Sequence, residues 1–290
     1  MLVAAVVTLQ ALEEGVLHGE TGRLVHGLWF DQWARVDGLW ADRLHAARRA
    51  QPFTVSPLMG LPSGQDGRVP VTAESSAWFR VTSLQPDLST RLVNDWLPRL
   101  PEVLELGRPQ RLRWRLAGWT VDHHEHPWAG QVDARQLAQE RLLAKSPPHC
   151  WQLRFYTPTA FHGQAGHLPF PLPNALLGSW AARWQVYGPI GLPQDMPERA
   201  QRGLVISAFA LRTLPLRDSW RTVIGCVGNL SLRAVRSKQG EHGVVGLSAG
   251  ERAVIDLLVA YAFFAGSGHH TTQGMGLTRE VGKRTGTWGT

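Results

Sequence analysis

The order in which strand-like and helix-like patterns follow one another is the feature that most constrains this fold. A period-2 or continuous apolar pattern predicts a strand, and apolar residues at helical spacing predict a helix. In the first half of the chain these patterns predict a strand over 2–9, helices over 24–36 and 39–49, strands over 53–58 and 77–84, a helix over 88–100 and a strand over 111–121. Pro101 ends the last of these helices.

The second half repeats the series. Its apolar patterns predict a strand over 151–156, a helix over 174–187, strands over 204–211 and 222–235, a helix starting after Ser248, and a strand over 276–281. Ser248 and Glu251 form an S-x-x-E capping box at the start of the last helix. Strand, helix, strand, strand, helix, strand is the split βαβ order. We therefore expect an α+β fold of two tandem ferredoxin-like, RRM-like domains over 1–147 and 148–290, joined at the Lys145-Ser146-Pro147-Pro148 segment.

Length and charge agree with this organisation. The 290 residues are enough for two domains, and 43% hydrophobic with 18% charged residues excludes a disordered chain. The formal net charge is +7, and all but three of the 30 basic residues are arginine. Arginine suits phosphate because its planar guanidinium donates hydrogen bonds in pairs. Codon bias explains the same excess equally well, so charge alone does not establish a nucleic-acid partner.

The cysteines and the N-terminal residues indicate the cellular compartment in which we expect the protein to function. Cys150 and Cys226 form no C-x-x-C pair, which fits a reducing, cytoplasmic setting. The apolar start over 1–12 has no basic leader or convincing cleavage site, and no run approaches ~20 apolar residues. We expect a strand there and no membrane partner.

A glycine-rich segment, GSGHHTTQGMG, fills residues 266–276 between the last predicted helix and strand. Its four glycines allow close backbone approach to a ligand, and exposed N–H groups there could bind phosphate. Glycine-rich turns are common between a helix and a strand, so this pattern alone is a weak signal.

The same segment resembles the loop G-x-G-basic-basic-T-T-x-G-x-G of the RAMP-superfamily CRISPR-associated endoribonucleases that process precursor crRNA. His269 and His270 replace the usual lysine or arginine. Further resemblance lies in RLHAARRAQPFTVSPLMG at 43–60, FYTPTAFHG at 155–163 and WAARWQ at 180–185. The similarity thus spans nearly the whole chain.

The resemblance implies cleavage of CRISPR repeat RNA without metal or cofactor, through attack of a ribose 2′-OH on the adjacent phosphate. The products would be a 2′,3′-cyclic phosphate and a 5′-OH, and the crRNA would be kept for delivery to an effector complex. Two alternatives stay open: a noncatalytic RAMP subunit that only holds crRNA, and a basic ferredoxin-like protein acting on another RNA. Homodimerisation also stays open.

Two histidines are candidates for the proton transfers. His45 falls where the family often places its catalytic histidine, and His26 lies on the first helix, where other branches carry theirs. Imidazole suits a general base or acid near neutral pH, so one could act as each. Helix-end capping is the alternative role for His45.

Positive charge for the phosphate could come from Arg48 or Arg49, although each is equally well explained as a solvated arginine. The lysine of some relatives is replaced by Gln51, and the companion tyrosine position holds Phe30. These departures weigh against a full set of base, acid and cation.

The predicted RNA-binding residues lie in two places. In the glycine-rich segment they are Gly266, Gly268, His269, His270, Thr271, Thr272, Gln273, Gly274 and Gly276. On the strand over 111–121 they are Arg111, Arg113 and Arg115. The three arginines alternate and so share one face, which could follow an RNA backbone or could be an ordinary solvated face.

Two other groups of residues are expected to have no ligand. The run D-H-H-E-H at 122–126 has metal-ligand residue types, but neighbouring strand positions face opposite sides, so we expect a hydrophilic hairpin end and no metal. Five tryptophans occupy helical core positions and are predicted to pack in the core rather than stack on bases. They are Trp29, Trp33, Trp96, Trp180 and Trp184.

Overall fold

A computed structural model describes residues 1–18, 21–46, 50–62, 68–107, 110–163, 166–217, 222–235 and 246–282. The chain forms two compact units. Unit 1 contains Met1–Gln131 and the later segment His270–Met275, and unit 2 contains Val132–Leu216, Val223–His269 and Gly276–Thr290. Residues 270–275 of the glycine-rich segment therefore belong to unit 1, and residues 266–269 with Gly276 form its unit 2 half.

Unit 1 is built on an antiparallel sheet with strand order β3-β5-β1-β7-β6, and β8 also pairs with β1. The strands are β1 (Leu2–Ala11), β3 (Phe53–Val55), β5 (Ser76–Ser83), β6 (Val103–Leu106), β7 (Leu112–Thr120) and β8 (Gly130–Val132). The helices are α1 (Thr21–Val36), α2 (Gly38–Ala46) and α3 (Pro86–Arg91), and α3 continues into a π-helical turn over Leu92–Trp96. A separate pair joins β2 (Gly15–His18) to β4 (Arg68–Val71). Strands β3, β5, β1 and β7 are the second, third, first and fourth of a split βαβ, which confirms the ferredoxin-like prediction.

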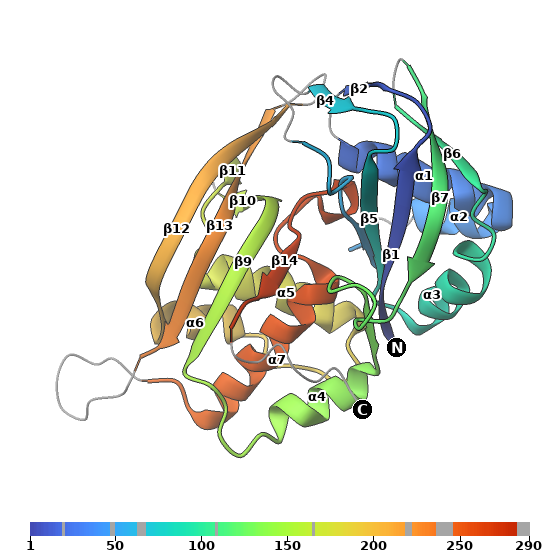
Figure 1. Cartoon of the computed structure of the whole chain (residues 1–290). Helices are drawn as coiled ribbons and strands as arrows, with labels where there is room; N and C mark the ends of the chain where they lie inside the picture. The colour runs from blue at the N-terminus through green and yellow to red at the C-terminus, as the bar shows by residue number, and fades with distance from the viewer. Residues whose placement is uncertain are drawn as a thin grey trace. The chain divides into compact units, whose positions relative to one another are not determined.

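The core of unit 1 lies between this sheet and helices α1, α2 and α3 (Figure 1). Alternate β1 residues from Val3 to Leu9 belong to it. Trp29, Trp33 and Trp96 are fully buried, and the Trp29 ring lies 5.1 Å from that of Trp96. These three tryptophans are core residues, as predicted.

Unit 2 repeats the arrangement, with strand order β12-β13-β9-β14. Its strands are β9 (Cys150–Thr159), β10 (Phe161–Gly163), β11 (Gly166–Leu168), β12 (Leu204–Arg217), β13 (Thr222–Ala234) and β14 (Thr278–Glu280). Its helices are α4 (Ala134–Leu142), α5 (Pro173–Tyr187), α6 (Met196–Gly203) and α7 (Ala249–Ala265). β12, β13, β9 and β14 are again the second, third, first and fourth strands of a split βαβ. The chain is therefore an α+β protein in which one architecture occurs twice.

Helix α7 begins where the sequence predicts. Ser248 Oγ accepts the Glu251 backbone N–H, and the Glu251 carboxylate accepts the Ser248 backbone N–H, so both capping-box bonds are present. Trp180 and Trp184 of α5 are fully buried, and Trp184 contacts Tyr261 of α7. These two tryptophans also lie in the core, as predicted.

Helix α4 determines where the units divide. It packs against α7, and its Arg141 donates a 3.1 Å hydrogen bond to the buried Asp256 carboxylate. Trp151 Nε1 donates to the same carboxylate over 3.0 Å. Because α4 is tied to unit 2, the division falls after Gln131, before this helix, whereas the boundary expected near residue 147 lies after it.

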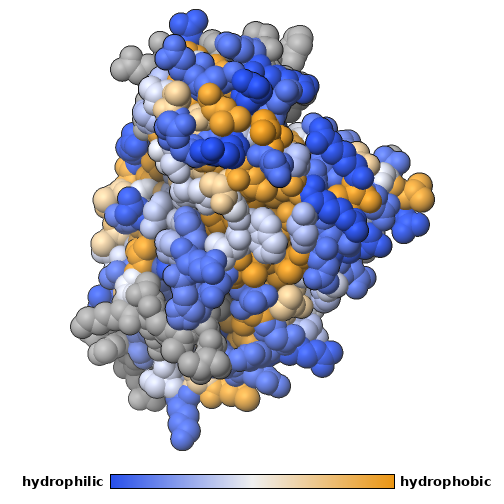
Figure 2. All heavy atoms as spheres, turned by 45° about the vertical axis from the view of Figure 1, so that its right-hand side comes forward, coloured by the Kyte–Doolittle hydropathy of each residue, from blue (hydrophilic) through white to orange (hydrophobic). Residues whose placement is uncertain are grey.

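Among the described residues, every helix is too short or too polar to cross a membrane. Figure 2 shows hydrophilic side chains over much of the face it presents, with hydrophobic patches between them.

Candidate active site

The structure brings together the two histidines predicted to carry the chemistry. His26 lies on α1 and is half-buried, while His45 is the penultimate residue of α2 and is exposed. Both rings contact Phe30, with centroid distances of 5.0 Å for His26 and 5.1 Å for His45. The two imidazoles therefore both lie against the ring of Phe30. Arg48 and Arg49, the candidate cations, lie outside the described residues.

The tautomer of His26 is determined by one hydrogen bond. Its Nδ1 atom lies 2.7 Å from the backbone carbonyl oxygen of Thr272. A carbonyl oxygen can only accept, so Nδ1 carries the proton and donates it. In the neutral ring the Nε2 atom then has an unprotonated lone pair, which is what a general base requires.

Electrostatics also favour the neutral form of His26. Burial lowers the pKa of His26 below its ordinary value, because burial disfavours the charged ring. The Thr272 carbonyl raises this pKa, and the positive charges of His45 and Arg23 lower it further. The net pKa of His26 is lowered, so the ring is neutral at physiological pH.

Two glycines bring Thr272 to His26. A Cβ on Gly22 of α1 would lie 2.3 Å from the Gln273 carbonyl oxygen, and one on Gly274 would lie 2.7 Å from the Gly22 Cα. Gly274 also has φ +94°, which disfavours a side chain. Gly22 and His26 are four residues apart and share one face of α1, so the loop that touches Gly22 also reaches His26.

Sequence reasoning did not single out Gly22. The available signal is a Thr-Gly pair one helical turn before the histidine. Thr21 is buried, and its Oγ1 accepts the Leu58 backbone N–H over 3.1 Å. Small residues thus line the part of α1 against which the loop packs.

The unit 2 half of the glycine-rich segment is held by helix α5. Trp180 Nε1 donates to Ser267 Oγ over 3.0 Å, and the Gly268 N–H donates to Ser179 Oγ over 3.3 Å. Arg183 donates to the Ala265 carbonyl oxygen and, over 3.4 Å, to that of Gly268. Sequence reasoning missed the roles of Ser179 and Arg183, although both lie within or beside the WAARWQ stretch.

Most backbone amides of the segment donate inside the protein, which corrects the expectation that they are exposed to phosphate. The amides with protein acceptors belong to Gly266, Ser267, Gly268, His269, Gln273, Met275 and Gly276. The backbone is used to hold the loop against α1, α5 and β9. The amides of these seven residues are therefore already used within the protein, and the Thr271 side chain is itself buried.

His269 belongs to a cluster of three imidazoles within unit 2. The β10–β11 hairpin pairs His162 with His167, and the Nδ1 atom of His167 lies 2.9 Å from Nε2 of His269. The ring of His162 also lies 4.9 Å from that of His269. Sequence reasoning missed His162 and His167, because the β10–β11 hairpin lies far from His269 in the sequence; His167 and His269 are 102 positions apart. Next to this cluster along the chain, His270 is exposed.

The three arginines of the predicted RNA track share an exposed face, as the alternation predicts. Arg111 lies 3.6 Å from the Glu105 carboxylate, and Arg113 lies 3.6 Å from that of Glu13. Arg115 donates to the Gln10 side chain. Two of the three charges thus have a carboxylate beside them, which favours the solvated-face alternative for Arg111 and Arg113.

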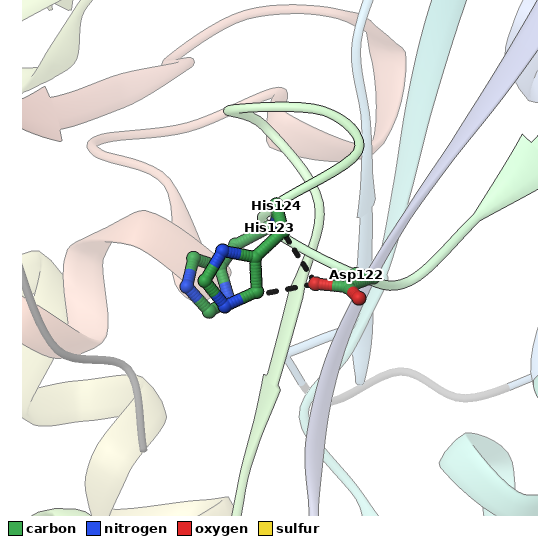
Figure 3. Close-up of side chains that lie close together, drawn as sticks. All are labelled: Asp122, His123 and His124. Atoms are coloured by element: carbon green, nitrogen blue, oxygen red, sulfur yellow. Dashed lines mark hydrogen bonds and ion pairs between the residues drawn. The ribbon is translucent and has the colours of Figure 1, made fainter. Parts of the chain in front are cut away.

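The D-H-H-E-H run does not follow the geometry assumed from its sequence. β7 ends at Thr120, and the backbone N–H groups of Glu125 and His126 both donate to the Asp122 carbonyl oxygen. The run is a turn, so strand alternation does not separate its side chains. Figure 3 shows the His123 and His124 rings beside the Asp122 carboxylate.

Family comparisons agree with the two-unit architecture. The N-terminal domain model of the CRISPR Cas6 family matches residues 1–139, and the model of the CRISPR-associated endoribonuclease Cas6 matches residues 153–278. No curated protein matches the sequence.

Solved structures give the same result. A Cas6 product complex is 28% identical, with a TM-score of 0.75 over 97% of this chain and 100% of the other. Thermus thermophilus Cas6 is 25% identical, with a TM-score of 0.71 over 97% of this chain and 98% of the other. A Cas6 substrate mimic complex is 25% identical, with a TM-score of 0.68 over 97% and 100% of the two chains. Together with the family models, which cover most of the chain, these matches show that the protein belongs to the Cas6 family of CRISPR-associated endoribonucleases.

Proposed function

We propose that this protein cleaves CRISPR repeat RNA in the precursor transcript, with His26 as general base and His45 as general acid. The observation that carries the assignment is the hydrogen bond from His26 Nδ1 to the Thr272 carbonyl oxygen, because it leaves Nε2 as the acceptor. His45 is the second imidazole beside the same Phe30 ring, and its exposure allows it to exchange protons with solvent.

His26 and His45 account for both proton transfers of the proposed reaction. His26 Nε2 removes the proton of a ribose 2′-OH, and the oxygen attacks the adjacent phosphorus. The bond from phosphorus to the 5′ oxygen breaks, and protonated His45 gives its proton to that oxygen. The products are a 2′,3′-cyclic phosphate and a 5′-OH, and water exchange returns both imidazoles to their starting forms.

Both proton transfers use imidazole, so the proposed reaction needs no metal ion. Charge on the phosphorane oxygens requires a cation or hydrogen-bond donor. Arg48 and Arg49 follow His45 closely in sequence and are the proposed source of this charge.

We assign RNA contact in the glycine-rich segment to side chains. His269, His270 and Gln273 are at least partly exposed, whereas the neighbouring amides are largely used within the protein. Imidazole binds phosphate as a cation only when protonated, so this contact should weaken as pH rises. We include delivery of the retained crRNA to an effector complex in the proposal.

The test is incubation of the cognate repeat RNA with the protein in excess EDTA. The proposal expects cleavage, a 2′,3′-cyclic phosphate end, and loss of cleavage when the nucleotide before the cut carries a 2′-deoxy sugar. Cleavage that stops in EDTA, or that proceeds on the 2′-deoxy substrate, contradicts it.

A noncatalytic RAMP subunit is the second candidate, because Phe30 and Gln51 stand where some relatives carry a tyrosine and a lysine. The same experiment separates the two. A wild-type protein that binds the repeat and never cuts it supports the noncatalytic subunit.

A further inference from the structure

The turn after β7 gathers three metal-ligating side chains that the cleavage chemistry does not use. The ligand atoms of Asp122, His123 and His124 all lie within 4.8 Å of one another (Figure 3). They come from three consecutive residues, so their convergence depends on how the turn is closed.

Backbone hydrogen bonds close this turn around Asp122. Its Oδ1 atom accepts the His124 N–H over 2.8 Å, and its carbonyl oxygen accepts the N–H groups of Glu125 and His126 over 3.2 and 3.1 Å. Its own N–H donates to Thr120 Oγ1 over 2.9 Å. The turn is therefore ordered by its own hydrogen bonds, and the two imidazoles lie on the same side as the carboxylate.

The spacing suits a small divalent ion. His123 Nδ1 lies 3.7 Å from Asp122 Oδ1, too far for a hydrogen bond. Two ligands bound tetrahedrally to zinc at their usual lengths are separated by about 3.4 Å. A small movement of one side chain would let both atoms bind the same ion. The ring centroids of His123 and His124 are 3.9 Å apart, so the imidazole of His124 lies close to that of His123.

We propose that Asp122, His123 and His124 form a binding site for a divalent transition-metal ion of the zinc class. Two imidazoles and one carboxylate suit Zn²⁺, Co²⁺ or Ni²⁺ and are a poor set for Mg²⁺ or Ca²⁺, which prefer oxygen ligands. Asp122 and His124 are exposed and His123 is half-buried, so water can fill the remaining coordination positions.

The other two residues of the run lie outside this ligand set. His126 Nδ1 accepts the Trp128 N–H over 3.2 Å, and its ring packs 4.7 Å from that of Trp78. Glu125 is exposed and is not part of the three-residue group. Glu125 therefore provides a matched control, since it is a neighbouring carboxylate on the same turn.

The proposed ion would stabilise the turn at the end of β7, and it takes no part in the proposed cleavage. Removal of metal should therefore lower thermal stability without stopping the reaction. A failure of the cleavage proposal would leave this inference unaffected, because metal binding is measured on the free protein.

The experiment uses the full chain, freed of any purification tag and stripped of metal by chelator. Co²⁺ is titrated while its visible absorption is followed, and Zn²⁺ is titrated calorimetrically. We expect the wild type to bind one metal ion per chain with saturation. His123→Ala and His124→Ala should each bind the ion at least about tenfold more weakly, and Glu125→Gln should bind it as the wild type does. Circular dichroism of each metal-free variant verifies that it is folded.

The histidine cluster of unit 2 gives the decisive comparison. His167→Ala removes a member of that cluster and should leave the binding of one metal ion per chain unchanged. The inference is overturned if the wild type shows no saturable binding, if His123→Ala and His124→Ala bind as the wild type does, or if binding is lost in His167→Ala.

Discussion

His26 of helix α1 donates through Nδ1 to the backbone carbonyl oxygen of Thr272, 2.7 Å away and 246 residues later in the chain. This single contact determines which ring nitrogen can act as a base. In the proposed mechanism it also links the glycine-rich segment to catalysis by a route other than RNA binding.

The pH dependence of cleavage should follow the titration of His26. Burial, together with the charges of His45 and Arg23, holds the pKa of His26 below its ordinary value of 6.5. A general base must be neutral, so the single-turnover rate should rise with pH along an ascending limb whose midpoint lies below about pH 6.5. The rate should fall again at higher pH, because the mechanism also requires a protonated general acid. Arg23→Gln removes one lowering influence and should shift this midpoint to higher pH. A midpoint that moves to lower pH in Arg23→Gln would be inconsistent with His26 as the base.

The close approach of Gly22 and Gly274 should be essential for cleavage. A Cβ on either residue would meet backbone atoms at 2.3 to 2.7 Å, so Gly22→Ala should push the loop away and break the bond to His26. We expect a cleavage rate lowered by tenfold or more, roughly the loss of one hydrogen bond to a catalytic group. Gly27→Ala on the same helix is the control, because its Cβ would meet nothing within 4 Å. It should leave the fold intact and raise the free energy of unfolding slightly. An active Gly22→Ala would mean that the loop does not position His26.

Arg183 should stabilise the unit 2 half of the glycine-rich segment. Its guanidinium satisfies the carbonyl oxygens of Ala265 and Gly268, and burial lowers its pKa without discharging it. Arg183→Gln should lower the free energy of unfolding by about 1–3 kcal/mol and weaken repeat-RNA binding. Urea denaturation and a filter-binding titration measure the two effects. Arg212→Gln, which changes an exposed arginine of β12, should leave stability unchanged.

The buried carboxylate of Asp256 should contribute far more to stability than a surface carboxylate does. It is 1% exposed and accepts from both Trp151 Nε1 and Arg141. Asp256→Asn removes the charge beside the Arg141 guanidinium and should lower the free energy of unfolding by about 3–5 kcal/mol. The surface pair of Asp95 and Arg99, 3.4 Å apart, gives the comparison, since Asp95→Asn should cost at most about 1 kcal/mol. Equal effects of the two changes on the urea midpoint would contradict this assignment.

Much of the fold could be predicted because each long element carries its own pattern. The spacing of apolar residues alone predicts the β1 strand and the face of α1 that carries Trp29 and Trp33. The capping residues Ser248 and Glu251 predict where α7 begins. The β10–β11 hairpin could not be predicted, because strands of three residues hold too little alternation. Helix α4 was missed because its mean hydropathy is low and few of its residues are buried.

The site was predictable in part. His26 and His45 followed from the family resemblance, but their shared contact with Phe30 requires the packing of α1 on α2. The roles of Gly22 and Arg183 depend on contacts across many positions of sequence, which no local pattern encodes. The Asp122 turn was misjudged because alternation was assumed beyond Thr120, where β7 ends.

His26 and His45 are proposed to perform the proton transfers of RNA cleavage, and a comparison of their alanine variants with the wild type decides whether they do. Wild type, His26→Ala and His45→Ala are compared on the cognate repeat RNA in EDTA, under single-turnover conditions at saturating protein. We expect the wild type to release a product with a 2′,3′-cyclic phosphate. We expect each variant to bind the RNA as tightly and to cut it at least about 100-fold more slowly, the usual share of general acid–base catalysis. Cleavage by either variant at the wild-type rate would contradict the account.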